Sequence, residues 1–183
     1  MNMTALHPNT QTLLSAWERM SAVPTLKGVG PSSAQHPDII DCLFVLERHD
    51  EDVWAFRSAG DRMAHLLGRE LAGHDYLDFW TGHDRQMLTS FLMAVHESRL
   101  PGIVQASGET LTGERIDIEM TLAPMTSLKG SSQQVRLLGL YQTLRGTEIL
   151  KRRPVWRHRL TAIFPPDIRG DEPHLRLITN SDD

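Results

Sequence analysis

A single cysteine, Cys42, is present among the 183 residues of this sequence, so an intramolecular disulfide bond is excluded. Such sparing use of cysteine is typical of proteins from a reducing compartment. Because Cys42 falls in a predicted core strand, we expect a buried structural thiol there and not a nucleophile.

Long apolar runs are also missing from the sequence. None approaches the roughly 20 residues that a membrane-spanning helix requires. The first ten residues, M-N-M-T-A-L-H-P-N-T, contain neither the basic segment nor the apolar segment of a secretory signal. We therefore expect a cytoplasmic protein without a membrane span.

Neither sign of charge dominates the chain, which has 19 Lys and Arg, 23 Asp and Glu, and a formal net charge of -4. Domains that bind nucleic acid are usually basic, so nucleic acid is not the expected partner. With 40% hydrophobic and 23% charged residues, the chain can form a packed core and is not disordered as a whole.

The motifs of catalysis and cofactor binding are missing too. The sequence has no G-x-S-x-G, no H-E-x-x-H, no C-x-x-C and no glycine loop with phosphate-binding spacing. We therefore predict that the protein is not an enzyme, has no catalytic residues and binds no metal. The sequence requires no cofactor.

The residues that are present predict four parts: a flexible lead (1–9), an N-terminal helix (10–23), a domain (38–145) and a basic-then-acidic tail (146–183). Leu13, Leu14, Trp17 and Met20 recur at helical spacing in the first helix. An isolated helix of this length is marginal, so its apolar stripe should dock on the domain or on a second copy of the chain. The second alternative predicts a homodimer.

Alternating and continuous apolar patterns predict strands at 42–47, 53–58, 103–109, 115–122 and 135–141. A short helix is expected at 59–68, and a longer one begins after Thr81. Thr81 and Asp84 resemble a capping box for this longer helix. The three late strands have short connections and should be antiparallel neighbours, which predicts an α+β fold.

Three motifs narrow the fold further: W-A-F-R-S-A-G-D-R (54–62), L-L-G-R-E-L-A-G-H-D (66–75) and Y-L-D-F-W (76–80). With them, roughly residues 10–145 resemble a family of small bacterial single-PAS-domain regulatory proteins. The family pattern has a more basic, proline-marked stretch after the first helix, where this sequence has S-A-V-P-T-L-K-G-V-G.

The resemblance implies a PAS fold, a five-stranded antiparallel sheet with helices on one face and a pocket beneath them. It implies a dimer contact through the N-terminal helix and a regulatory role without an output domain on the same chain. Some members of the family take part in cell-cycle or motility control. The resemblance carries over no catalytic residue.

Candidate pocket residues follow from this picture. Tyr76, Phe79 and Trp80 are favoured as core-filling side chains. In the alternative interpretation, Tyr76 and Trp80 lie at a pocket mouth with Met87 and Phe91 as a wall. Arg57 either forms a structural ion pair, which we favour, or holds an anionic group of a ligand.

Nine histidines are scattered along the chain. His83 and His96 fall on the predicted long helix, where haem-binding PAS sensors place an axial ligand, and they are weak haem candidates. A partly exposed surface histidine is the favoured interpretation of each.

The tail begins with K-R-R-P-V-W-R-H-R (151–159), in which five of nine residues are Lys or Arg. A linker or partner-docking tail is favoured over a nucleic-acid site. Residues 174–179 are a possible short strand.

The sequence thus predicts a non-catalytic signalling PAS module that acts through protein contacts and responds to a small ligand. Its expected partners are a kinase, a phosphatase or a localisation factor. The alternative is a sensor that carries haem or another cofactor.

Overall fold

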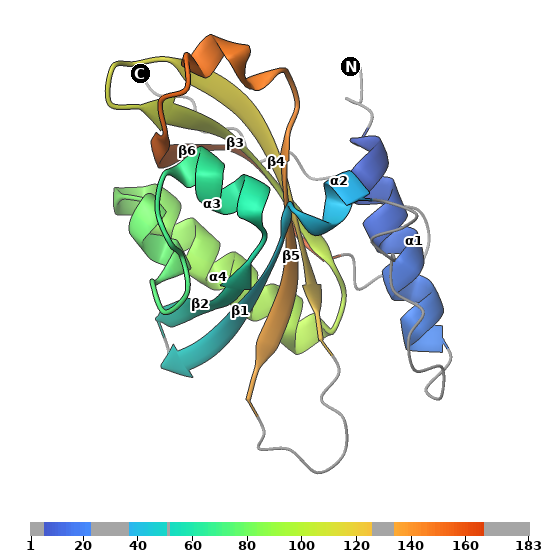
Figure 1. Cartoon of the computed structure of the whole chain (residues 1–183). Coiled ribbons are helices and arrows are strands. Elements are labelled where there is room, and N and C mark those ends of the chain that lie inside the picture. Colours follow the sequence, from blue (N-terminus) through green and yellow to red (C-terminus); the bar gives the residue numbers. More distant parts are fainter. Residues whose placement is uncertain (1–5, 23–36, 51, 126–133, 167–183) are drawn as a thin grey trace.

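The computed structural model describes residues 6–22, 37–50, 52–125 and 134–166. Its centre is one six-stranded antiparallel sheet with the strand order β2-β1-β5-β4-β3-β6. Helices lie on both sides of this sheet, α3 and α4 on one side and α1 and α2 on the other (Figure 1). The described residues contain no helix that is long and apolar enough to cross a membrane.

All five predicted strands are present. They are β1 (Leu43–Asp50), β2 (Val53–Ala59), β3 (Gly102–Thr110), β4 (Arg115–Pro124) and β5 (Arg136–Thr143). Strands β1 and β2 form a hairpin, and β3, β4 and β5 are consecutive antiparallel neighbours, as their short connections predict.

The sixth strand, β6 (Val155–Phe164), corrects the sequence analysis, which assigned these residues to a tail and expected five strands. It pairs with β3 along its length. Val155, His158 and Ile163 of this strand are buried, whereas Arg157 and Arg159 are at least partly exposed. The arginines suggested a basic tail, and the strand was therefore not predicted. In the structure, they are the exposed residues of a strand whose other residues are buried.

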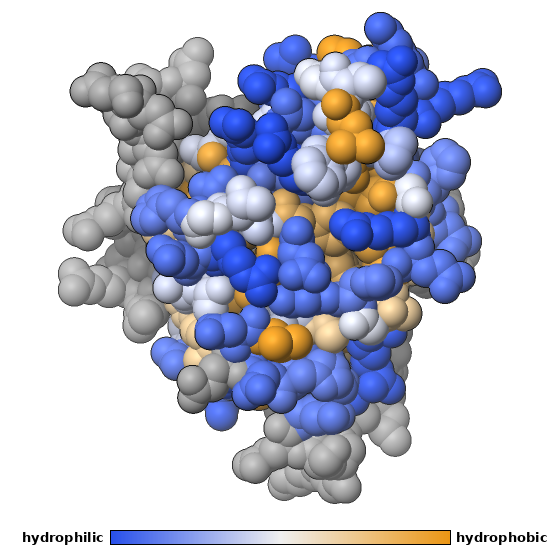
Figure 2. Space-filling view, turned by 90° about the vertical axis from the view of Figure 1, so that its left-hand side faces the viewer, coloured by the Kyte–Doolittle hydropathy of each residue, from blue (hydrophilic) through white to orange (hydrophobic). Residues whose placement is uncertain are grey.

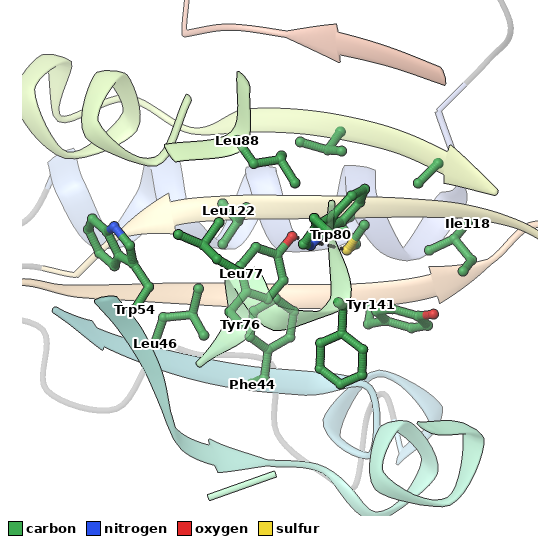
Figure 3. Packing of buried hydrophobic residues seen from close by; sticks show 14 of the residues in the cluster. Phe44, Leu46, Trp54, Tyr76, Leu77, Trp80, Leu88, Ile118, Leu122 and Tyr141 are labelled. Atoms are coloured by element: carbon green, nitrogen blue, oxygen red, sulfur yellow. Dashed lines mark hydrogen bonds between the residues drawn. The ribbon is translucent and has the colours of Figure 1, made fainter. Parts of the chain in front are cut away.

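The inner face of the sheet is covered by α3 (Asp61–Leu67), a 3-10 turn η1 (Tyr76–Phe79) and α4 (Gly82–Ser98). Side chains from these elements and from the strands form the main core (Figure 3). On the outside, this side of the molecule is mostly hydrophilic, with apolar atoms visible between the polar side chains (Figure 2). A second 3-10 turn, η2 (Thr147–Leu150), connects β5 to β6.

Helix α4 begins after Thr81, as predicted, but without the capping box. The Thr81 side chain makes no capping hydrogen bond. The Asp84 carboxylate instead accepts a hydrogen bond from the backbone N–H of Leu160 on β6, at 3.0 Å. The acidic residue of the expected box therefore joins the helix to the sheet.

The outer face is covered by α1 (Pro8–Ala22) and the short α2 (Pro37–Ile40). Leu13 of α1 and Ile39 of α2 are fully buried in a second apolar cluster with Cys42 and Leu140. Trp17 donates a hydrogen bond from Nε1 to the carbonyl oxygen of Pro124, at 3.1 Å. The predicted stripe therefore docks on the chain's own sheet.

A buried carboxyl group anchors the start of α1. Glu119 on β4 is 1% exposed, and its Oε1 accepts hydrogen bonds from the Thr10 hydroxyl at 2.7 Å and the His7 backbone N–H at 3.1 Å. Gln105 donates to Oε2 at 3.2 Å. One carboxyl group therefore supplies acceptors to the first turn of α1, where the helix itself provides none.

Replacement of this anchor is expected to loosen the helix. In Glu119→Ala, the Thr10 hydroxyl and His7 N–H lose their buried acceptor, and the free energy of unfolding should fall by about 2 kcal/mol. Hydrogen exchange at the α1 amides should accelerate more than exchange in β4. The control is Glu18→Ala, on the exposed side of α1. Unchanged α1 protection in Glu119→Ala would contradict the assignment.

Candidate functional site

A pocket of about 150 Å³ opens at one end of the sheet, where α3, the start of β1, the end of β5 and η2 meet. Its lining is mostly apolar, with a few polar groups that could orient a ligand. The residues that line it are Cys42, Arg62, Met63, His65, Leu66, Tyr141, Thr143 and Thr147.

The Cys42 thiol in this pocket is a weak nucleophile. Burial is the main cause that raises the pKa of the Cys42 thiol, and the positive charge of Arg62 only partly opposes this effect. The thiol is therefore held in its protonated, weakly nucleophilic form. Arg62 and His65 are exposed members of the lining. The site suits a small molecule with an apolar body and an anionic group.

Backbone contacts place α3 beside this pocket. Gly60 lies so close to Asp41 that an added Cβ would fall 2.3 Å from the Asp41 carbonyl oxygen. The same oxygen accepts hydrogen bonds from the N–H groups of Arg62 and Met63 at the start of α3. The glycine of the A-G-D-R motif therefore permits the close approach that seats the helix.

Tyr141 connects the pocket to the core and to β6. Tyr141 is one of the pocket-lining residues, and its hydroxyl lies 2.7 Å from Nε2 of His158 (Figure 3 labels Tyr141 among the buried side chains). Both residues are 3% exposed. A ligand in the pocket would therefore touch a side chain that is hydrogen-bonded to β6.

Aromatic rings surround His158. Its ring stacks on Trp80 with centroids 5.0 Å apart and lies edge-on to Phe79 and Tyr141 at 5.5 and 5.7 Å. Burial, with a smaller contribution from the positive charge of Arg69, lowers the pKa of His158 to about 3. The imidazole is neutral near pH 7. Among the described residues, neither His158 Nδ1 nor Trp80 Nε1 has a hydrogen-bond partner.

The structure places four of the predicted pocket residues in or against the main core. Tyr76 and Trp80 are neighbours with ring centroids 6.1 Å apart, Phe91 is buried, and Met87 packs against the cluster. The Tyr76 hydroxyl donates to the sulfur of Met120 at 3.4 Å. None of the four lines the pocket described above.

Arg57 lies apart from these residues. Its Nη1 is 3.1 Å from the Glu47 carboxylate, which also accepts a hydrogen bond from Arg136 at 2.6 Å. These arginines, chiefly Arg136 through its hydrogen bond, lower the pKa of Glu47. The geometry agrees with the structural ion pair that the sequence analysis favoured.

The haem candidates also lie outside the pocket. His83 is exposed at the start of α4, and His96 is half-buried near its end. Within the described residues, no three His, Cys, Asp or Glu side chains are grouped to hold a metal ion.

The predicted site residues include neither Tyr141, which lines the pocket, nor its hydrogen-bond partner His158. His158 stands between two arginines in W-R-H-R, which was interpreted as part of a basic tract. A usable signal was present, because Val155, Trp156, Leu160, Thr161, Ile163 and Phe164 are all residue types that are common in strands or cores. Their number in ten residues indicates a strand.

Comparisons with known proteins agree with this architecture. A family model described as a PAS domain matches residues 5–142. No curated protein matches the chain. The solved structures that it resembles include the blue-light photoreceptor Aureochrome1 LOV in its light state, with 12% identity, a TM-score of 0.45, and coverage of 66% of this chain and 93% of that one.

The PAS domain of BvgS from Bordetella pertussis is similar as well. It has 16% identity and a TM-score of 0.43, with coverage of 62% of this chain and 86% of that one. The predicted PAS fold and family resemblance are confirmed, with one strand more than expected.

The buried His158 predicts a specific pH dependence. Its folded-state pKa lies below the ordinary value of 6.5, so the unfolded chain binds a proton first as the pH falls. His158 therefore costs no stability at pH values above its ordinary pKa. As the pH falls from there toward the folded-state pKa, the free energy of unfolding declines. Between neutral pH and about pH 4.5, this residue should cost about 2–3 kcal/mol of unfolding free energy.

The measurement is urea unfolding across this pH range for the natural chain and for His158→Phe/Tyr141→Phe. The double change removes both hydrogen-bonding groups together, so it leaves neither partner unsatisfied. The variant should show a shallower loss of stability with falling pH. Identical pH dependence in the two proteins would show that His158 is not a buried neutral group.

Proposed function

This chain belongs to the PAS domain family, and on that premise we propose that it is a non-catalytic signalling module whose protein contacts respond to a small ligand. The proposed setting is the bacterial cytoplasm, in a cell-cycle or motility type of control. Its proposed partners are a kinase, a phosphatase or a localisation factor.

The observation that carries the proposal is the hydrogen bond between Tyr141, which lines the pocket, and His158, on β6. A ligand that displaces the Tyr141 ring must strain or break this bond. Because His158 is buried among aromatic rings, it has little freedom to follow without a movement of β6. Pocket occupancy would thereby alter the edge of the sheet.

The ionisable groups support a binding role. Cys42 is held as a thiol, and His158 has too low a pKa to serve as a base near pH 7. The Glu47 and Glu109 carboxylates are ion-paired to arginines, which lower their pKa values. Each group is committed to packing or to a charge pair.

Hexanoate is a suitable first probe, because it combines a short apolar chain with a carboxylate. We expect it to bind in isothermal titration calorimetry and to change hydrogen exchange at the β6 amides. Leu66→Trp fills the pocket and should abolish binding. Leu111→Trp, at a position 76% exposed in the β3–β4 turn, is the matched control and should bind normally.

Tyr141→Phe separates binding from signalling. It keeps the ring that lines the pocket and removes only the hydroxyl, so hexanoate should still bind while the change at β6 is lost. Equal hexanoate binding by Leu66→Trp and the natural chain would refute the pocket assignment. Native mass spectrometry of the purified chain would reveal any natural ligand directly.

A homodimer through α1 remains part of the proposal. Since Leu13 is fully buried against the chain's own sheet, a second copy would contact the half-buried Leu14 and Met20. Leu14→Glu should halve the mass found by light scattering, whereas Glu18→Ala should leave it unchanged. A monomeric natural chain at high concentration would remove dimerisation from the proposal.

A further inference from the structure

Five cationic side chains gather around two carboxylates where the β3–β4 hairpin turns and β6 begins. Glu109 and Glu114 are the carboxylates, on the last residues of β3 and just before β4. The set gives a local excess of three positive charges in a chain whose net charge is -4. We name it the arginine surface; its cations are Arg115, Lys151, Arg153, Arg157 and Arg159.

Glu109 organises three of these cations. Its Oε2 accepts hydrogen bonds from Nε and Nη2 of Arg157, at 3.1 and 3.0 Å. Arg115 lies 3.6 Å from Oε1, and Arg159 lies 3.9 Å from Oε2. The hydrogen bond from Arg157, aided by the other arginine charges, lowers the pKa of Glu109. One carboxylate thus neutralises one of three guanidinium groups.

Glu114 interacts with the remaining two cations. Arg153 donates to its carboxylate, and Lys151 lies 3.9 Å away. Hydrogen bonds from the hydroxyls of Thr110 and Thr112 are the main causes that lower the pKa of Glu114 to about 2. The side chains of Arg153 and Lys151 stay 48% and 71% exposed. Their remaining donors are open to an external acceptor.

Apolar side chains accompany these charges. Trp156 is 49% exposed at an irregularity of the β3–β6 pairing, where the partners of Glu109 and Thr110 are Arg157 and Val155. Leu111 is 76% exposed in the adjacent turn. Exposed tryptophan beside arginine is the composition of binding hot spots between proteins.

We propose that the arginine surface binds an acidic segment of a partner protein, with an apolar residue of that segment against Trp156. This inference rests on the proposed function, in which the chain acts through protein contacts. Four of the five cations are arginines, whose planar guanidinium groups match carboxylates in pairs of hydrogen bonds. The positive excess supplies the charge complementarity.

The two glutamates in the arginine surface disfavour a polyphosphate or a lipid membrane as the partner. Glu109 and Glu114 lie among the cations, where they would repel the uniform negative charge of nucleic acid or anionic lipid. A protein segment can place its few carboxylates beside the arginines and keep its own charges away from these two glutamates. Mixed charge of this kind favours a partner with a defined side-chain pattern.

The arginine surface is also adjacent to the hydrogen bond between Tyr141 and His158. His158 stands between Arg157 and Arg159 in β6 and points into the core, while the two arginines reach the Glu109 carboxylate outside it. A shift of β6 that follows loss of the Tyr141 bond would move both arginines. Ligand occupancy and partner affinity would then be coupled.

The test uses a fluorescein-labelled peptide of alternating glutamates and leucines, with fluorescence anisotropy as the readout. Arg157→Gln/Arg159→Gln should weaken its binding by at least about tenfold, because charge-assisted hydrogen bonds are lost. Trp156→Ala, a change at an exposed position, should weaken it several-fold. The charge-matched control Arg19→Gln/Arg99→Gln, at exposed positions outside the surface, should bind like the natural chain.

Three results would overturn the proposal. They are equal weakening by the control variant, equal binding of a peptide with glutamine in place of glutamate, and tighter binding of phosphatidylserine vesicles or a short DNA duplex. Hexanoate binding is measured on the same variants. If hexanoate binds and the peptide does not, the arginine surface is wrongly assigned while the proposed ligand response stands.

Discussion

Coverage of the sheet on both faces by the same chain is the constraint on which the other features depend. A sheet with one face in water can leave polar side chains hydrated, but here α1 and α2 cover the middle of the outer face, and α3 and α4 cover the inner face. Every polar group at the enclosed positions then needs a partner. Glu119 meets this demand with the first turn of α1, and Glu47 meets it with two arginines.

The same constraint explains the hydrogen-bonded pair of Tyr141 and His158 beside the pocket. Tyr141 and His158 are polar side chains on the inner face, and the Tyr141 hydroxyl is the hydrogen-bond partner of His158 Nε2. Such a pair is more directional than apolar packing, since a hydrogen bond weakens steeply when its geometry changes. It lies between a pocket at the end of the sheet and the strand that carries the arginine surface. In the proposed function, this position would couple ligand binding to partner contact over a short distance.

Local patterns predicted the elements whose periodicity was clean. In β4, apolar Ile116, Ile118 and Met120 alternate with polar residues, and the strand and the residues that face the main core follow from them. The pattern failed at β6, where arginines on one face masked the buried residues on the other. For Tyr76 and Trp80 it favoured core packing, with a pocket mouth walled by Met87 and Phe91 as the alternative. In the described structure, Tyr76, Trp80 and Phe91 lie in the main core and Met87 packs against it.

By itself, the sequence determined the type and order of five strands and two inner-face helices, and with its motifs the PAS fold. These depend on interactions between near neighbours, which residue spacing records. Only the tertiary structure decided that Asp84 contacts β6, that Glu119 anchors α1, and that Tyr141 meets His158. The residues in each of these contacts come from separate elements, so their proximity exists only after the sheet has formed and its helices have packed against it.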